Sequence, residues 1–193
     1  IMLRWGPSDA STWRLGNRYG YEVMRYTILK NKKIPKEIEG RLMTPEPLRP
    51  LPLERWEPYV TDRYAAIAAE CLYGSYYKGV PTGNSPHLAY QKYREEQHRF
   101  SFALYAADQS RVVAGLSGLY WVDRSARADE KYLYKVYIPC PDSVAVDTGS
   151  VFTGLSEAIA LPKPMDLTGR WDDRKVMLSW SVVYHRHIYN RYQ

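Results

Sequence analysis

The chain has 193 residues, of which 45% are hydrophobic, 14% aromatic and 25% charged, and its formal net charge is +6. A chain this rich in apolar and aromatic residues can bury a core, so the composition excludes an intrinsically disordered tail. No apolar run reaches the roughly 18 residues that a membrane-spanning helix needs, and two cysteines are too few for a disulfide-based scaffold.

Residues 1–30 are predicted to form a strand, a Gly-Pro-Ser-Asp loop and a second strand. Every second residue from Ile1 to Trp5 is apolar, and aromatic and β-branched residues alternate with others from Tyr19 to Tyr26. Alternation with a period of two residues favours β-strands. Because the first residue is Ile1 and no signal peptide is visible, we expect either a removed leader or a fragment of a longer protein.

A basic run at residues 30–36 contains four lysines, and the first 51 residues carry ten Lys and Arg against five Asp and Glu. A nucleic-acid-binding surface usually places aromatic side chains between such charges. Here Asn31 and Pro35 separate the lysines instead, which favours a solvated hairpin tip. We therefore expect no nucleic-acid partner.

The segment at residues 44–58 contains five prolines, which excludes a regular helix or a central strand. We predict an extended surface connector there. Two helices should follow, the first capped by Thr61 or Asp62 and ended by Gly74. The second is predicted to begin at Pro86 and to carry one apolar stripe over about five turns, with charged residues on the opposite face.

The strand pattern returns after a short helical turn at residues 111–116. Strands are predicted at residues 119–123, 132–138 and within 144–155. A Leu-Pro-Lys-Pro run at residues 161–164 is typical of an interdomain linker, and a β-hairpin turning at Asp172 and Asp173 is predicted after it.

The two ends of the chain resemble each other. Leu3-Arg4-Trp5, with tyrosines downstream, is echoed by Leu178-Ser179-Trp180, again with tyrosines downstream. A repeat at the scale of a domain suggests a tandem array.

These segments resemble a known family. The stretch from Leu161 to Trp180 resembles the opening of a fibronectin type III domain, with a proline-rich entry, a short strand, a turn and a second strand that ends in Trp. Residues 129–137, Asp-Glu-Lys-Tyr-Leu-Tyr-Lys-Val-Tyr, resemble a later strand of that family, in which a turn leads into Tyr-x-Tyr-x-Val.

The resemblance covers about residues 1–30 and 119–193 and implies a mainly β fold with an α insertion. Residues 1–160 would form a fibronectin type III-like β-sandwich that carries a helical hairpin at about residues 40–118. Residues 161–193 would supply the first strands of a second, incomplete sandwich, whose open edges need further strands or a partner.

The resemblance also implies three structural residues. Trp5 and Trp180 would be the buried indoles of two successive domains. Tyr132 would be the tyrosine-corner residue, with its hydroxyl bonded to the backbone near the preceding turn.

Patterns that carry catalysis are missing from the sequence. It contains neither a Gly-x-Ser-x-Gly nucleophile elbow nor a Gly-x4-Gly-Lys-Ser/Thr phosphate-binding loop. His185 and His187 share one face of a predicted strand, but no third ligand accompanies them. We expect no catalytic residue, no cofactor and no metal, while an enzyme whose active site lies partly outside this sequence stays open.

The aromatic residues offer the candidate binding surface, with 18 Tyr and 6 Trp against 3 Phe. Tyr and Trp suit half-exposed sites because each joins an apolar ring to a polar atom. The candidates are aromatic residues in or beside predicted loops, namely Trp56, Tyr73, Tyr76 and Tyr77. Trp13, Trp56, Tyr76 and Tyr77 could form a platform for sugar rings, although the Tyr-rich composition of β-sandwiches explains these residues as well.

Cys71 and Cys140 lie 69 residues apart and could pair in an oxidising compartment or stay as thiols, and we favour unpaired thiols. We expect a non-enzymatic modular protein, structural or adhesive, of a bacterial surface, an extracellular assembly or a phage virion. It would act through protein partners or neighbouring domains of the same longer chain. The alternative is a carbohydrate-binding accessory module of a surface glycan-processing protein.

Overall fold

The computed structural model describes residues 1–74, 86–141, 143–157 and 165–181. The chain divides into two compact units, Ile1–Glu157 and Ala158–Gln193. Helices and strands both contribute substantially, so the content is mixed α/β. The elements in chain order are β1 (Met2–Arg4), α1 (Ala10–Tyr19), β2 (Glu22–Lys30), β3 (Gly40–Leu42), the 3₁₀ helix η1 (Leu53–Tyr59), α2 (Arg63–Tyr73), α3 (Pro86–Gln109), α4 (Arg111–Leu116), β4 (Tyr120–Val122), β5 (Glu130–Tyr137), β6 (Gly149–Gly154), the 3₁₀ helix η3 (Leu155–Glu157), β7 (Met165–Asp172) and β8 (Lys175–Ser181).

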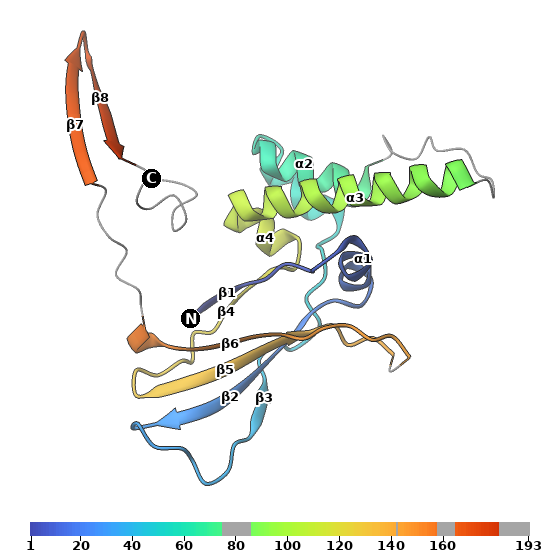
Figure 1. The fold of residues 1–193 in the computed structure, drawn as a ribbon, viewed down its shortest axis with the longest axis vertical. Coiled ribbons are helices and arrows are strands. Elements are labelled where there is room, and N and C mark those ends of the chain that lie inside the picture. Colours follow the sequence, from blue (N-terminus) through green and yellow to red (C-terminus); the bar gives the residue numbers. More distant parts are fainter. Residues whose placement is uncertain (75–85, 142, 158–164, 182–193) are drawn as a thin grey trace. The chain divides into compact units, whose positions relative to one another are not determined.

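The first unit contains two antiparallel sheets (Figure 1). The larger has the strand order β3-β2-β5-β6, and the smaller pairs β1 with β4. Val23 of β2 and Tyr132 and Tyr134 of β5 project from one face of the larger sheet and share a buried cluster with Leu3 of β1. Side chains of the two sheets therefore form one core.

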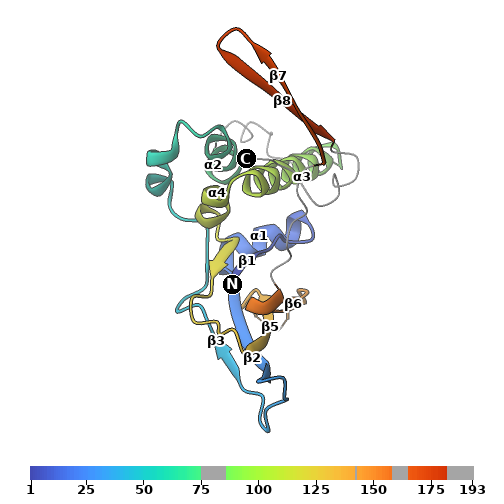
Figure 2. The ribbon, with the colours of Figure 1, turned by 90° about the vertical axis from the view of Figure 1, so that its left-hand side faces the viewer.

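Helices α2, α3 and α4 form a separate layer of the first unit. In Figures 1 and 2, α2, α3 and α4 lie together on the side of β1 and β4 that faces away from the larger sheet. Small side chains let these helices pack closely, and the buried alanines are Ala65, Ala68, Ala106, Ala107 and Ala114. The N-caps of these helices are residues of the preferred types. The Asp62 carboxylate accepts the Tyr64 N–H at 2.8 Å, and Ser110 caps α4.

The prediction for α2 is confirmed, with Asp62 as N-cap and Gly74 as C-cap. Helix α3 also begins at Pro86 as predicted. One residue of its predicted charged face, Arg99, lies against the end of α2 instead and donates to the carbonyls of Cys71 and Gly74 at 3.2 and 3.3 Å. A guanidinium at a helix C-terminus satisfies carbonyls that the helix itself leaves without partners.

The first 30 residues contain a helix that the strand-loop-strand prediction missed. Asp9 caps α1 by accepting the Thr12 N–H at 2.8 Å, and the apolar face of α1 buries Trp13. Strand β2 begins only at Glu22, after Gly20 has turned the chain with a φ of +84°. The helix overrides the strand pattern because Trp13 finds a partner in Phe100 of α3, with ring centroids 6.3 Å apart.

The proline-rich segment is extended only in part. Leu53–Tyr59 forms the 3₁₀ helix η1 directly after Pro52, and Pro58 lies inside it. Proline fits a helical first turn, and a single short 3₁₀ helix loses little from one missing amide. The predicted loop between Gly74 and Pro86 and the linker at residues 161–164 lie outside the described residues.

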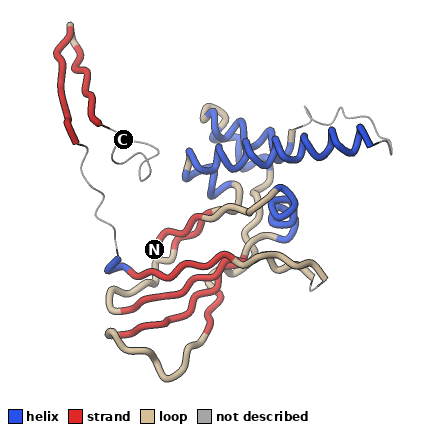
Figure 3. The backbone as a smooth tube through the Cα atoms, viewed as in Figure 1, coloured by secondary structure: helices blue, strands red, loops and turns tan. Residues whose placement is uncertain are grey.

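The described part of the second unit is the hairpin of β7 and β8, whose turn is at the predicted position (Figure 3). Trp171 pairs with Val176, and Gly169 with Leu178, which places these apolar side chains on one face of the hairpin. That face is open, since Trp171 is 87% exposed and Leu178 is exposed as well.

Candidate functional site

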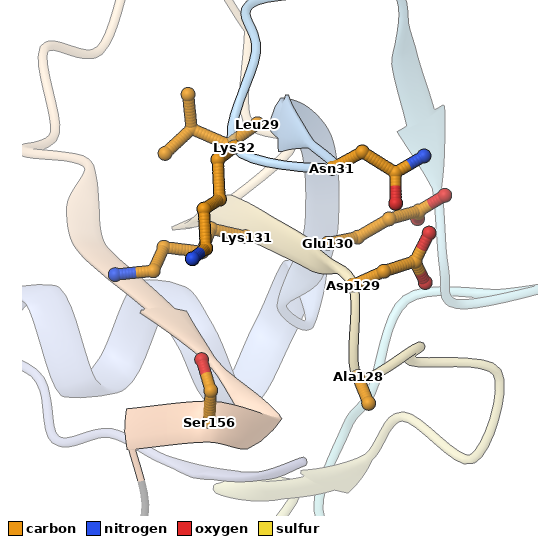
Figure 4. Close-up of a pocket in the computed structure, with 8 residues that line it drawn as sticks. All are labelled: Leu29, Asn31, Lys32, Ala128, Asp129, Glu130, Lys131 and Ser156. Carbon is orange, nitrogen blue, oxygen red and sulfur yellow. The ribbon is translucent and has the colours of Figure 1, made fainter.

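A pocket of about 650 Å³ lies at one end of the larger sheet, where the turn after β2, the start of β5 and η3 meet (Figure 4). Most of its lining is polar or charged, and the residues are Leu29, Asn31, Lys32, Ala128, Asp129, Glu130, Lys131 and Ser156. Three separate segments thus converge on it.

The turn after β2 shapes one wall of this pocket. Asn31 and Lys32 have φ angles of 50° and 62°, and Lys30 and Lys33 exchange backbone hydrogen bonds of 2.9 and 3.0 Å. Two successive residues with positive φ form a type I′ turn, which matches the twist of a hairpin and favours Asn at its first position. The Asn31 N–H also donates to the Asp129 carbonyl at 2.9 Å, which fixes the turn against the corner before β5.

The charged groups of the pocket separate into two sides. Figure 4 shows Lys32 and Lys131 extending to one side, while Asn31, Asp129 and Glu130 point to the other. Lys131 forms an ion pair with Glu157, and the Lys30 ammonium lies 3.8 Å from the Glu130 carboxylate. The pocket therefore has a basic side and an acidic side.

The pocket holds no nucleophile with an adjacent histidine base. Ser156 contributes its only hydroxyl among the lining residues. His87 and His98, the histidines in the described part of the chain, both belong to α3, which contributes nothing to the lining.

Tyr132 links the pocket to the core. Its hydroxyl accepts the Arg127 N–H and donates to the Glu130 carboxylate, both at 2.8 Å. This is the backbone contact near the preceding turn that the family resemblance implied for Tyr132. Burial raises the pKa of Tyr132, so the hydroxyl stays protonated and keeps Glu130 in place.

A buried ion pair joins the two sheets beside Tyr132. Arg25 of β2 donates to the carboxylate of Asp123, which follows β4, at 2.6 Å, and Tyr134 donates to the same carboxylate at 2.7 Å. Ser125 donates to the other carboxylate oxygen at 2.7 Å. Burial alone would raise the pKa of Asp123, but the hydrogen bonds from Tyr134, Ser125 and Arg25 lower it to about 2.

This network supports the fold and is closed to substrates. The Asp123 side chain has no exposed area and that of Arg25 only 10%. The sequence offered a signal for it, because Arg25 alternates with Val23 on the inward face of β2, and a charge at an inward position requires a partner of opposite charge. Asp123 was predicted only as the last residue of a strand at residues 119–123, so its role was missed.

A second candidate surface lies on α3. Four of its aromatic side chains are more than half exposed, namely Tyr90, Tyr93, Phe102 and Tyr105. Tyr105 meets the Tyr64 ring edge-on at 6.1 Å, and the Arg63 guanidinium lies 4.6 Å from the centre of the Tyr64 ring. Exposed aromatic and Arg side chains in one region are typical of protein-binding surfaces.

The sequence-derived binding residues are placed differently from the expected platform. Trp56 is only 3% exposed, and its indole N–H and the Tyr73 hydroxyl both donate to the Leu51 carbonyl, at 2.8 and 2.7 Å. The structure therefore brings Trp56 and Tyr73 together, and the atom that both side chains contact is the backbone carbonyl oxygen of Leu51, just before η1. Tyr76 and Tyr77 lie outside the described residues. Trp13 is buried on the inner face of α1, against Phe100 of α3, so it offers no face to a sugar either.

Two of the expected structural residues are half-buried. Trp5 packs between the core clusters, with its ring centroid 5.9 Å from that of Tyr21. Trp180 of β8 is also half-buried.

Cys71 and Cys140 are both free thiols. Burial raises the pKa of the Cys71 thiol to about 11, which keeps it unreactive. Within the described ranges, no three His, Cys, Asp or Glu side chains gather as metal ligands would, and the His185 and His187 pair lies outside those ranges. None of the described helices combines the length and apolar character that a membrane crossing requires.

Comparisons of the chain with family models, with curated proteins and with solved structures gave no match.

Proposed function

We propose that the first unit is a fibronectin type III-like sandwich with a helical insertion. Two features support this. The sheets β1-β4 and β3-β2-β5-β6 bury a common cluster, as sandwich sheets do. Tyr132, near the start of β5, bonds back to the Arg127 N–H five residues upstream, which is the geometry of a tyrosine corner.

The β7–β8 hairpin is proposed as the opening of a second sandwich. Trp171, Val176 and Leu178 form one apolar face of the hairpin. Such alternation is typical of a strand pair that another sheet covers. An isolated two-stranded hairpin is marginal in water, so this pair needs further strands or a partner.

The function we propose is that of a non-enzymatic modular protein, structural or adhesive, in a surface or extracellular assembly, which binds other proteins. The observation that carries it is that four aromatic side chains of α3 are exposed, namely Tyr90, Tyr93, Phe102 and Tyr105. Aromatic side chains dominate the energetics of protein interfaces. A helical layer added to a sandwich, with its aromatic side chains facing water, is well suited to docking.

Site-specific photo-crosslinking tests the proposed docking surface. A benzoylphenylalanine is placed at Tyr93 or Tyr105 and, as a control, at the exposed Lys36, and the protein is irradiated in the cells that produce it. We expect one recurrent protein adduct from the two α3 positions and none from Lys36. Equal labelling at all three positions would contradict the proposal.

The surface location has its own test. Protease treatment of intact cells should remove the protein if it is displayed outside. Full protection of the protein in intact cells, with cleavage only after lysis, would contradict the surface location.

A further inference from the structure

Strand β6 forms one edge of the larger sheet. In the strand order β3-β2-β5-β6 it pairs with β5 alone, through six residue pairs without a shift of register. Every second residue of such a strand points its N–H and C=O groups away from its neighbour. Residues 149–152 are exposed, so along this part of β6 those groups face water and can pair with another strand.

The opposite edge of the same sheet is protected, whereas β6 is not. Strand β3 is three residues long, carries Arg41 at its middle position and is followed by Pro45 and Pro47. Short strands, charges and prolines keep sheet edges from pairing with other chains. The sequence of β6, Gly-Ser-Val-Phe-Thr-Gly, contains no charge and no proline, and its pairing with β5 has no bulge. Among the described strands, only β4 is also uncharged, and it has three residues.

The middle of β6 carries two exposed apolar side chains. Val151 and Phe152 are 47% and 46% exposed, and as neighbours in a strand they lie on opposite faces of the sheet. Phe152 pairs with Leu133, which pairs with Tyr26, so Phe152 extends an apolar row across the face opposite the buried Tyr134. A strand added at this edge would cover part of both side chains.

We propose that a second copy of this chain occupies the edge, with the two β6 strands antiparallel and related by a two-fold axis through the middle of the strand. In a two-fold dimer the same surface meets itself, so it must be complementary to itself. Strand β6 meets this condition because an uncharged strand brings no like charges together. Two β3 edges, in contrast, would place Arg41 close to its own copy.

This dimer has a defined end. It joins the two four-stranded sheets into one continuous sheet and places Phe152 of both copies on the same face at the seam. Both outer edges of the joined sheet are then the protected strand β3, so assembly stops at two chains. Helix α3 contributes no residue to the interface, so the inference goes beyond the proposed docking on α3 and stands independently of it.

The first test is sedimentation velocity of the 193-residue chain over about a hundredfold range of concentration. We expect a weak, concentration-dependent dimer, because one pair of strands is small for a stable interface. Hydrogen exchange at the two ends of this range locates the contact. Amides of β6 should exchange about tenfold more slowly at the highest concentration, while those of β3 should not change.

A pair of matched variants tests the edge itself. Phe152→Lys should raise the dissociation constant of the dimer about tenfold or more, since it places two like charges at the seam. Leu42→Lys is the control, because Leu42 lies on the same sheet face at the other edge and is 44% exposed. It should leave the dissociation constant unchanged.

Disulfide trapping tests the register without adding a charge. A two-fold axis at the middle of β6 places either Val151 or Phe152 opposite its own copy, so Val151→Cys or Phe152→Cys should give a covalent dimer on mild oxidation. Leu42→Cys should give none. Cys140 is replaced by Ser in all three proteins, while Cys71 is buried.

Three results would overturn the proposal. A chain that stays monomeric at every concentration would leave the β6 edge to a strand of another protein. A dimer whose β6 amides exchange as fast as those of the monomer would form through another surface. Equal effects of the Phe152 and Leu42 substitutions would likewise exclude β6 as the specific contact.

Discussion

Strands β5 and β8 carry the same alternating pattern and bury it to very different extents. In β5, Tyr132 and Tyr134 are completely buried. In β8, Val176 and Leu178 also share one face, yet both are exposed. The difference is a covering layer, because side chains of β1 close over β5, whereas the described part of the second unit is a single hairpin.

The same comparison explains where charges are tolerated. In the first unit Arg25 is inward-facing, and Asp123 and Tyr134 neutralise and hydrogen-bond it. In the hairpin the charged pair of Lys175 and Asp172 lies in water, with 3.4 Å between the charged atoms. A covered sheet face forces charges into pairs, while an open one leaves them solvated.

The largest expected effect comes from breaking the buried ion pair. Asp123→Ala should lower the free energy of unfolding by about 3–5 kcal/mol, because it leaves the Arg25 guanidinium and the Tyr134 hydroxyl without their acceptor in the core. Urea denaturation measures this loss. The double variant Arg25→Met/Asp123→Leu should lose less than Asp123→Ala alone, and the reverse order would contradict this reading of the pair.

Acid should produce the next largest effect. The pKa of Asp123 is lowered to about 2 in the folded chain, so its stabilising contribution is complete above the unfolded value of about 3.9. It is lost as the pH falls from about 4 to about 2, and amounts to about 2 kcal/mol. Urea midpoints across this range should fall steeply for the unmodified chain and less steeply for the Arg25→Met/Asp123→Leu double variant. If the urea midpoints of both proteins fell in parallel, carboxylates other than Asp123 would dominate the loss of stability in acid.

Removing one hydroxyl from the core should have a smaller effect. Tyr132→Phe abolishes the bonds to the Arg127 N–H and the Glu130 carboxylate and should cost about 1–2 kcal/mol. Tyr105→Phe is the control, because Tyr105 is about half exposed and should change the urea midpoint little. Equal effects of the two substitutions would mean that the Tyr132 hydroxyl does not stabilise the corner.

The smallest effect is expected on the open face of the hairpin. Trp171 is 87% exposed, so Trp171→Ser should change the free energy of unfolding by less than about 0.5 kcal/mol. Val23→Ala, a truncation inside the core of the first unit, should cost several times more. Circular dichroism melts of both variants measure these losses of stability. A loss above about 1 kcal/mol for Trp171→Ser would mean that this face of the hairpin is covered in solution.

Much of the local structure could be predicted because its signals are local. The caps Asp62 and Gly74 bound α2, Pro86 opens α3, and two aspartates mark the turn between β7 and β8. The alternation that predicted strands covers residues 1–5 and 19–26 and predicts no element for residues 10–18, so helix α1 was missed. Its Trp13 meets the ring of Phe100, which lies 87 residues further along the chain.

The candidate sites were predicted less well than the elements. Burial depends on contacts between distant residues, so the sequence could not show that Trp56 would be buried by η1 and α2 while Trp5 would keep an unpartnered N–H. The basic run at residues 30–36 was read as a hairpin tip, and the isolated bridge between Lys30 and Lys33 confirms that turn. The pocket beside it needs Asp129 and Ser156 from elsewhere in the chain.

The sequence by itself determined the periodicities, the caps and the turns, because each depends on residues within a few positions of one another. Only the tertiary structure decided which alternating faces are covered, which charges become a buried pair and which aromatic rings meet water. Those outcomes depend on Arg25 reaching Asp123 and on Leu3 reaching Tyr134, separations of about a hundred residues that no local pattern encodes.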